Sequence, residues 1–456
     1  MHLPAPLTSV HLACAERLVD TALLQYVSSY LDTTLEWSLD EAAGAGFLHL
    51  VRRLHAAGAA ATEDAIDWAA ANGHLGVVQW LHAHRNDGAT TWAIDNAASS
   101  GHLTLVCWLL THRREGCTHR AMDAAAGNGH LDVVQWLHSH GCASATAAAM
   151  DGASTTGALH IVQWLHANRT EGCSIHAFDG AATNGHLHVL QWLHRHRSEG
   201  GSVTAMDGAV HNGHFDVVVW LQTHRHEGCS ERALHAAIAS HRLDLVRYLC
   251  EHGHGAPCAP WSLVWAAKCA ADAIGAYLLS FHEHSPIQLQ TALNAAAAAG
   301  SISLVTHLLH HVSDRGSVAI DGAASRGHLE MVQLLHAHRF PGSSLALEGA
   351  SAGGHLDIVD FLLQTCKLVP TPRAVDRAAS RSHVPVLQRL LDRGAIASSS
   401  ALRAAAAHGH ADVVALLLDA SDTVLDVEIA HTAAIANGHV DVAMLLDTAR
   451  RSSSTC

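Results

Sequence analysis

Histidine and cysteine are the residue types in this chain best suited to chemistry, because both ligate metal ions. The sequence contains 42 histidines and 11 cysteines among 456 residues. The densest local group is Cys250, His252, His254 and Cys258, whose side chains suit zinc. Their spacing matches no recognised zinc-finger pattern, and glycine and proline lie between them. We therefore expect an ordinary solvated loop here, and no metal or cofactor.

Most other histidines recur at regular positions, one of which follows the glycine of a Gly-His-Leu motif. Such histidines could bind metal, or they could hydrogen-bond to the backbone of a turn. Regularly spaced single histidines do not converge on one point, so the backbone role is favoured. If they are bonded as neutral rings, stability should fall below about pH 6, because imidazoles titrate in this range. The histidines at this position are His74, His102, His130, His186, His214, His328, His355, His383, His410 and His439.

Tryptophan recurs in the same way at another position. An open ladder of aromatic rings could hold a ligand, whereas buried rings would fill volume between neighbouring segments. The position flanks an apolar stripe, which favours packing. The six tryptophans are Trp80, Trp108, Trp136, Trp164, Trp192 and Trp220.

Charged pairs recur in the loops, where an acid follows an arginine by two residues. These pairs could form a solvated, salt-bridged edge that adds little stability. They could also form an edge for partner docking, since arginine is enriched in protein interfaces. The candidate partner-binding residues are Arg85, Arg113, Glu115, Arg169, Glu171, Arg197, Glu199, Arg225 and Glu227. No nucleotide-binding loop, nucleophile elbow or paired-carboxylate motif occurs, so we predict that the chain is not an enzyme and has no catalytic residue.

All of these positions belong to one segment that recurs about every 28 residues. Its clearest copies are AMDAAAGNGHLDVVQWLHSH (Ala121 to His140) and AFDGAATNGHLHVLQWLHRH (Ala177 to His196). Self-similarity at such a period predicts a solenoid, in which each repeat buries its apolar face against its neighbours. The small residue before His-Leu serves as an anchor for each copy. The anchors are Gly46, Gly73, Gly101, Gly129, Gly157, Gly185, Gly213, His241, Ala270, Gly300, Gly327, Gly354, Ser382, Gly409 and Gly438.

Each copy predicts two short helices on either side of its anchor. Alanine lies four residues before every anchor and leucine eight residues after it, as Ala125 and Leu137 do around Gly129. A position that accepts only alanine indicates closely packed helices, and one that is always leucine indicates a buried core. Glycine at the anchor is the expected left-handed end of the first helix. Neither helix is long enough to be stable alone, so stacking must hold both.

The sequence Gly-His-Leu-Asp-Val-Val-x-x-Leu resembles the second-helix signature of ankyrin repeats, and the Ala-Ala pair before it resembles the end of their first helix. The resemblance covers roughly residues 37–450 and implies an all-α, ankyrin-type α-solenoid of about 15 stacked helix-turn-helix repeats. Ankyrin repeats usually span about 33 residues and begin with Thr-Pro-Leu-His. Here the repeat is about five residues shorter and that start is absent, so binding through projecting β-turn fingers is not implied. At the position of the family's histidine stand Asp67, Asp95, Asp123, Asp151, Asp179, Asp207, Asp321 and Asp376.

The regularity of the copies divides the chain into five parts. We expect a helical cap over residues 1–36, regular tryptophan-rich repeats over 37–240, and irregular repeats with a bend or a contact site over 241–315. Regular leucine-rich repeats should follow over 316–450, and a disordered tail over 451–456. The copies leave little chain for a separate catalytic domain.

The bulk composition favours a protein partner. The formal net charge of −14 argues against nucleic acid, and no apolar run approaches the length of a membrane span. The cysteines lack a disulfide-scaffold spacing and no secretory signal is visible, so we expect reduced thiols and a cytoplasmic location. We predict a monomeric protein-protein interaction scaffold that binds along an extended repeat surface. The alternative is an adaptor that couples bound proteins to another activity, such as ubiquitin transfer, through the N-terminal segment.

Overall fold

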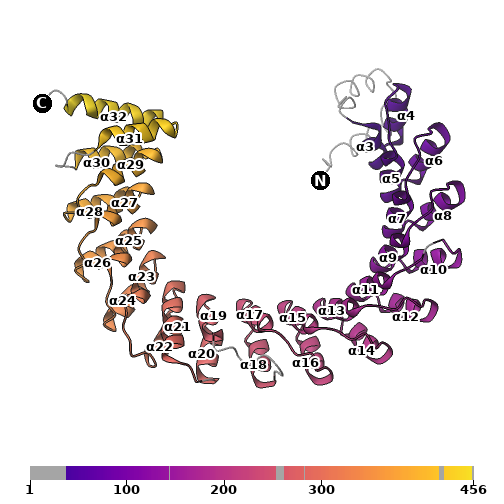
Figure 1. Ribbon diagram of the computed structural model, residues 1–456, viewed down its shortest axis with the longest axis horizontal. Coiled ribbons are helices and arrows are strands. Elements are labelled where there is room, and N and C mark those ends of the chain that lie inside the picture. Colours follow the sequence, from indigo (N-terminus) through magenta and orange to yellow (C-terminus); the bar gives the residue numbers. More distant parts are fainter. Residues whose placement is uncertain (1–36, 143, 253–260, 282, 421–425, 454–456) are drawn as a thin grey trace, which may run out of the picture. The chain divides into compact units, whose positions relative to one another are not determined.

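The computed structural model describes residues 37–142, 144–252, 261–281, 283–420 and 426–453. Within these ranges the chain forms thirty helices and no strand. The helices follow one another in fifteen pairs, each with a first helix before the anchor and a second helix after it (Figure 1). The all-helical solenoid predicted from the sequence is therefore confirmed. The chain divides into two compact units, Met1–Leu221 (unit 1) and Gln222–Cys456 (unit 2), and α16 crosses the division.

The helices keep their bounds closely from repeat to repeat. The first helices of unit 1 are α3 (Leu39–Gly44), α5 (Asp64–Ala71), α7 (Thr91–Ser99), α9 (His119–Gly127), α11 (Ala147–Thr155), α13 (Ile175–Thr183) and α15 (Val203–His211). Its second helices are α4 (Leu48–Ala56), α6 (Leu75–His84), α8 (Leu103–His112), α10 (Leu131–Ser139), α12 (Leu159–Asn168), α14 (Leu187–His196) and α16 (Phe215–His224). The first helices of unit 2 are α17 (Glu231–Ala239), α19 (Ser262–Lys268), α21 (Pro286–Ala299), α23 (Val318–Ser325), α25 (Ser344–Gly353), α27 (Pro372–Ser380), α29 (Ser399–Ala407) and α31 (Val427–Ala436). Its second helices are α18 (Leu243–His252), α20 (Asp272–Phe281), α22 (Ile302–Leu309), α24 (Leu329–Ala337), α26 (Leu356–Gln364), α28 (Val384–Asp392), α30 (Ala411–Asp419) and α32 (Val440–Ser453).

Every anchor residue adopts the left-handed conformation that the sequence predicts. The twelve glycine anchors have φ between 76° and 93°, as at Gly354 and Gly129. His241, Ala270 and Ser382 stand at the other three anchors and keep the same conformation, with φ of 55°, 53° and 60°. The packing of the two flanking helices therefore imposes this turn even where the residue does not favour it.

The core runs between the two layers of helices. Alanine four residues before the anchor is buried in every repeat, and leucine eight residues after it is buried in all but the first, where Leu54 is half-buried. Both Ala125 and Leu137 are 0% exposed. Val133 and Val134 complete the buried stripe of α10, also at 0% exposure. Each short helix is thus stabilised by neighbours in its own repeat and in the adjacent ones.

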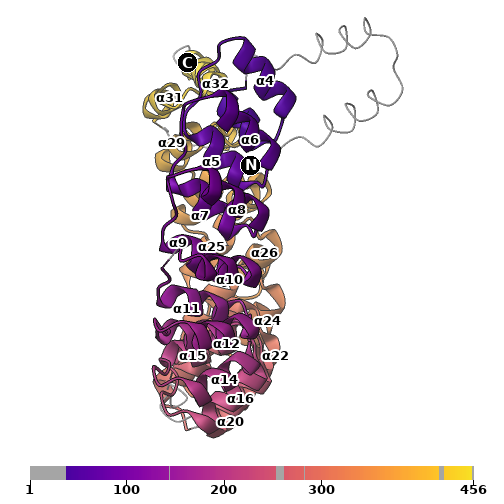
Figure 2. The ribbon, with the colours of Figure 1, turned by 90° about the vertical axis from the view of Figure 1, so that its right-hand side faces the viewer.

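The first helices of unit 1 approach one another closely at a column of glycines. A Cβ atom on Gly152 would lie 2.9 Å from the Cα of Gly127 in the preceding helix. At Gly180 a Cβ atom would collide with the hydroxyl of Thr155. Figure 2 shows α5, α7, α9 and α11 on one side of this unit and α6, α8, α10 and α12 on the other. Because glycine has no side chain, the first helices can stack more tightly than the second helices do.

Buried or half-buried aspartates join several of the first helices to the next one. The carboxylate of Asp95 accepts hydrogen bonds from the backbone N–H of Thr118 (2.9 Å) and from its hydroxyl (2.6 Å). Thr118 is the N-cap of α9, where its hydroxyl accepts from the N–H of Arg120. The same arrangement joins Thr90 to Asp67, Thr146 to Asp123, Ser174 to Asp151, Ser202 to Asp179 and Ser343 to Asp321. These aspartates stand where the ankyrin family has histidine, and they serve as links between repeats.

Replacing Asp95 with alanine should destabilise unit 1 by about 1–3 kcal/mol. The change leaves the N–H and the hydroxyl of Thr118 without their acceptor and weakens the cap of α9. Urea unfolding followed by circular dichroism measures the loss. Asp132→Ala is the control, because this exposed carboxylate bonds only to the adjacent Val133 N–H. Equal effects of the two changes would contradict the proposed link.

The irregular stretch predicted over 241–315 lies in unit 2 and keeps the helix pairs. Gly275 replaces an apolar residue in α20, and a Cβ atom there would lie 2.8 Å from the side chain of Leu304 in α22. The glycine thus makes room for a leucine of the next repeat. α21 is the longest first helix among the described residues, at 14 residues. The predicted N-terminal cap and most of the predicted tail lie outside the described residues.

Candidate functional site

The arginines of the loop edge are held within their own loops. Each pairs with the acid two residues later, and in Arg113 and Glu115 the Nε–Oε1 distance is 3.1 Å. Across the five pairs the arginine side chains are only 11 to 24% exposed. The hydrogen bond from Arg197 lowers the pKa of Glu199 to about 2, so that pair stays ionised. The members of this edge are Arg85 with Asp87, Arg113 with Glu115, Arg169 with Glu171, Arg197 with Glu199 and Arg225 with Glu227.

Each of several arginines also reaches back to the preceding repeat. Nη1 of Arg113 lies 3.3 Å from Nδ1 of His82, and Nη1 of Arg169 lies 3.4 Å from Nδ1 of His138. The guanidinium donates, so these histidines accept through an unprotonated Nδ1. The loop edge therefore holds adjacent second helices together and leaves little of each guanidinium accessible to a partner.

The tryptophan column packs between repeats, as the sequence predicts. The ring of Trp108 lies edge-on to His82 of the preceding repeat, with centroids 5.3 Å apart. It also stacks on His112 of its own helix, with centroids 4.6 Å apart. Similar pairs surround Trp80, Trp164, Trp192 and Trp220. The aromatic ladder is therefore a packing feature of the second helices.

The histidines after the anchors bond to the backbone of the preceding repeat, as predicted. Nε2 of His383 lies 3.0 Å from the carbonyl oxygen of Ala352, and His410 and His439 make similar contacts. In unit 1 the ring of His186 covers Gly157, where a Cβ atom would lie 2.6 Å from Nδ1. Burial lowers the pKa of His74, and also that of His186, below the usual 6.5.

These lowered pKa values predict that stability falls with pH on the acidic side of neutrality. The unfolded chain takes up protons near the usual pKa of 6.5, whereas His74 and His186 in the folded chain resist protonation. The stabilisation is complete above that pH and is lost as pH falls through the folded pKa values. We expect the Tm to be constant from about pH 8 to 7 and to fall by about pH 5.5. His119→Gln, a change at an exposed histidine, should leave the profile unaltered. A Tm that stays constant down to about pH 5.5 would contradict the prediction.

Only two members of the zinc candidate, Cys250 and His252, lie within the described residues. Cys250 is disulfide-bonded, and a disulfide sulfur is not the thiolate that ligates zinc. This bond corrects the expectation that all thiols are reduced, although seven other described cysteines are free. His254 and Cys258 lie outside the described residues. Over the described ranges, no three His, Cys, Asp or Glu side chains are placed to hold a metal ion.

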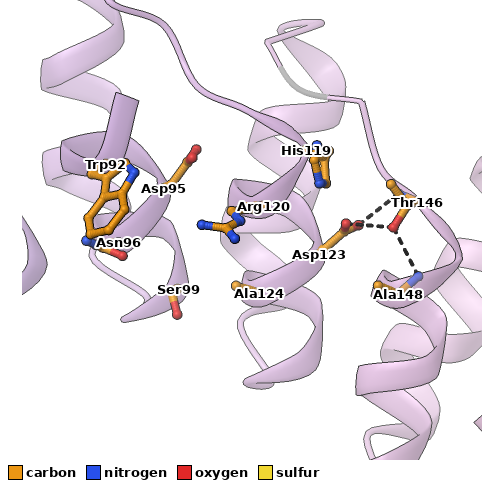
Figure 3. Close-up of a pocket in the computed structure, with 10 residues that line it drawn as sticks. All are labelled: Trp92, Asp95, Asn96, Ser99, His119, Arg120, Asp123, Ala124, Thr146 and Ala148. Atoms are coloured by element: carbon orange, nitrogen blue, oxygen red, sulfur yellow. Dashed lines mark hydrogen bonds between the residues drawn. The ribbon is translucent and has the colours of Figure 1, made fainter. Parts of the chain in front are cut away.

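The first helices of unit 1 form a groove that the sequence analysis missed. Figure 3 shows Trp92 and Asn96 of α7 facing Arg120 of α9. The groove encloses about 430 Å³, which lies within the range of ligand pockets. Its lining residues are Trp92, Asp95, Asn96, Ser99, His119, Arg120, Asp123, Ala124, Thr146 and Ala148.

Two side chains dominate this groove. Trp92 is 60% exposed, although tryptophan is usually largely buried. Arg120 is exposed, and no ion pair or side-chain hydrogen bond holds it within the described part of the chain. Among the described first helices of unit 1, from α3 to α15, it is the only arginine or lysine. The signal was present in the sequence, since tryptophan and arginine occupy a first-helix position that holds Ala148, His176 and Thr204 in the next repeats.

Two protein-family models match the chain. Ankyrin repeats in three copies match residues 178–259, and ankyrin repeats in many copies match residues 66–110. Together with the fifteen stacked helix pairs, these matches support an ankyrin-repeat family. The chain contains ankyrin repeats. Ankyrin repeats are protein-protein interaction modules, so the family indicates a binding function.

Solved structures include 112 matching chains, among them the ankyrin repeat domain of human ASB11. That structure is 24% identical, with 42% of this chain and 98% of the other chain covered and a TM-score of 0.33. No curated protein matches this ankyrin-repeat chain in sequence. Within the described residues, none of the helices combines the length and the apolarity needed to cross a membrane.

Proposed function

We propose that this ankyrin-repeat chain is a non-enzymatic scaffold that binds partner proteins through the first-helix face of unit 1. The observation that carries the proposal is the exposure of two tryptophans on that face. Trp68 on α5 is 44% exposed and Trp92 on α7 is 60% exposed. Exposed tryptophan is enriched among the residues that contribute most to protein binding.

The remaining surface of these helices suits a protein partner. Outside the capping aspartates, α9, α11, α13 and α15 present mostly small, hydroxyl or imidazole side chains together with Ile175 and Val203, both 43% exposed. A polar surface with a few apolar anchors is typical of transient protein interfaces. Affinity would accumulate over several adjacent repeats.

The loop edge predicted from the sequence is the second candidate surface. Its carboxylates remain 26 to 28% exposed, and their regular spacing could contact a partner of complementary charge. Its arginines already bond within the chain, which favours the first-helix face. The alternative adaptor function depends on residues 1–36, which lie outside the described residues. A monomeric state, a cytoplasmic location and the lack of nucleic-acid or membrane partners belong to the same proposal.

Crosslinking affinity purification with mass spectrometry tests the proposal. We expect a stoichiometric protein partner whose crosslinks map to the first helices of unit 1 and whose capture is lost in a Trp68→Ala, Trp92→Ala double variant. The matched control replaces Glu115, Glu171, Glu199 and Glu227 with glutamine, which removes four of the five negative charges of the edge at constant size. Loss of the partner in the control alone would move the binding surface to the loop edge. Absence of any stoichiometric partner would contradict the scaffold function.

A further inference from the structure

The groove between α7 and α9 differs from the grooves of the neighbouring repeats by one cation and one aromatic ring. In α11, α13 and α15, the position of Trp92 and Arg120 is filled by Ala148, His176 and Thr204. Among the described first helices of unit 1, only α7 and α9 place an exposed indole across from a guanidinium, the pair drawn in Figure 3. Unit 1 therefore presents one distinct binding element on an otherwise repetitive face.

Local hydrogen bonds hold Arg120 in place at the start of α9. Asp95 accepts from Thr118, and the hydroxyl of Thr118 accepts from the backbone N–H of Arg120 at 3.2 Å. The guanidinium itself extends toward Trp92 and Asn96 (Figure 3). Its planar donors match a carboxylate in a bidentate geometry, and its backbone is already fixed. Such preorganisation reduces the entropy lost on binding.

The carboxylates beside Arg120 limit the charge that the groove can accept. Asp95 is 5% exposed and its oxygens bond to Thr118, while Asp123 bonds to Thr146 at 2.7 and 2.8 Å. Neither aspartate pairs with Arg120, yet both place negative charge within the groove wall. Because the oxygens of both aspartates are already bonded, the guanidinium is the charged group left to pair with a ligand. The negative charge beside it disfavours a dianion such as a phosphoryl group more than a single carboxylate.

From this geometry we propose that the groove binds an acidic side chain of a partner protein, next to an apolar residue. The aspartate or glutamate carboxylate of the partner pairs with Arg120, and the neighbouring apolar side chain packs on the exposed face of Trp92. Asn96 and Ser99 supply amide and hydroxyl groups for the partner's backbone. The inference rests on the proposed scaffold function and names the chemistry of the partner at one place on the scaffold.

Selection of a random peptide display library on the full chain tests this inference. We expect enriched peptides in which an acidic residue lies beside an aliphatic or aromatic one. Fluorescence anisotropy of the labelled peptides should show affinity about tenfold weaker for Arg120→Gln and for Trp92→Ala. Both changes are at exposed positions, and unaltered thermal unfolding would show that the fold is retained.

Arg373→Gln is the matched control, because Arg373 occupies the equivalent exposed position at the start of α27 in unit 2, and no tryptophan stands at that position in α25 or α29. Affinity should not change in this variant. Enriched peptides without an acidic residue, or peptides whose affinity Arg120→Gln leaves unaltered, would overturn the inference and leave the scaffold function standing. A library with no enrichment would overturn it too. Preference for phosphorylated over glutamate-containing versions of the same peptides would show that a dianion is the true ligand.

Discussion

Leu137→Ala should lower the free energy of unfolding of unit 1 by about 2–5 kcal/mol, the cost of a cavity left by a buried leucine. Leu137 is 0% exposed and occupies the position that holds leucine in all fifteen repeats. Its side chain lies between α10 and the first helices, so truncation leaves a gap that flanking repeats cannot close without moving. Urea unfolding monitored by circular dichroism gives the change, and hydrogen exchange locates it near residues 121–140.

Gln135→Ala on the same helix is the control for that prediction. Gln135 is exposed, and alanine has the higher helix propensity, so the stability should change by less than about 0.5 kcal/mol. A loss below about 1 kcal/mol for Leu137→Ala would show that the repeats repack around the cavity.

Gly157→Ala should cost about 2–4 kcal/mol through two separate effects. The left-handed φ of 78° disfavours any side chain by about 1–2 kcal/mol. The new methyl group would also lie 2.6 Å from Nδ1 of His186, so the ring must move and its backbone contact is lost. The Tm and the urea midpoint of the purified variant measure the sum.

Gly129→Ala separates the two effects. Gly129 has a left-handed φ of 93°, but a Cβ atom there would have no neighbour within 4 Å. Its substitution should cost only the backbone term of about 1–2 kcal/mol. Equal losses at Gly129 and Gly157 would show that the histidine ring contributes nothing to the choice of glycine.

The architecture could be predicted from the sequence because each structural demand repeats fifteen times. Recurrence made the buried leucine, the close-packed alanine and the left-handed anchor visible without an alignment of relatives. Examples of these recurring positions in one repeat are Ala125, Gly129 and Leu137. The hydrogen-bond partners of the linking aspartates could not be predicted from the sequence. The serine or threonine that donates to each aspartate follows it by 22 to 23 residues, and only the stacking of adjacent repeats brings the two side chains together.

The candidate site was harder to predict for the opposite reason. A binding residue differs from the residues at the same position in other repeats. The residues that recur regularly in the sequence instead hold the solenoid together. The arginines of the loop edge are an example, since Arg113 bonds to Glu115 and contacts His82. Trp92 and Arg120 stand where α11, α13 and α15 have Ala148, His176 and Thr204, and their exposure emerges only when the helices are placed side by side.

The aspartate links between first helices have a mechanical consequence. Within unit 1 each repeat contacts its neighbours, so a force that pulls on one end is carried from repeat to repeat in series. Detaching one repeat requires its Asp–Ser or Asp–Thr link to break, after which roughly 28 residues extend to about 90–100 Å of contour. Under tension, unit 1 should therefore lengthen in similar steps, one for each repeat that detaches. A detached repeat should refold against the adjacent repeat that is still folded. The spacing of those steps would report directly on the short repeat of this chain.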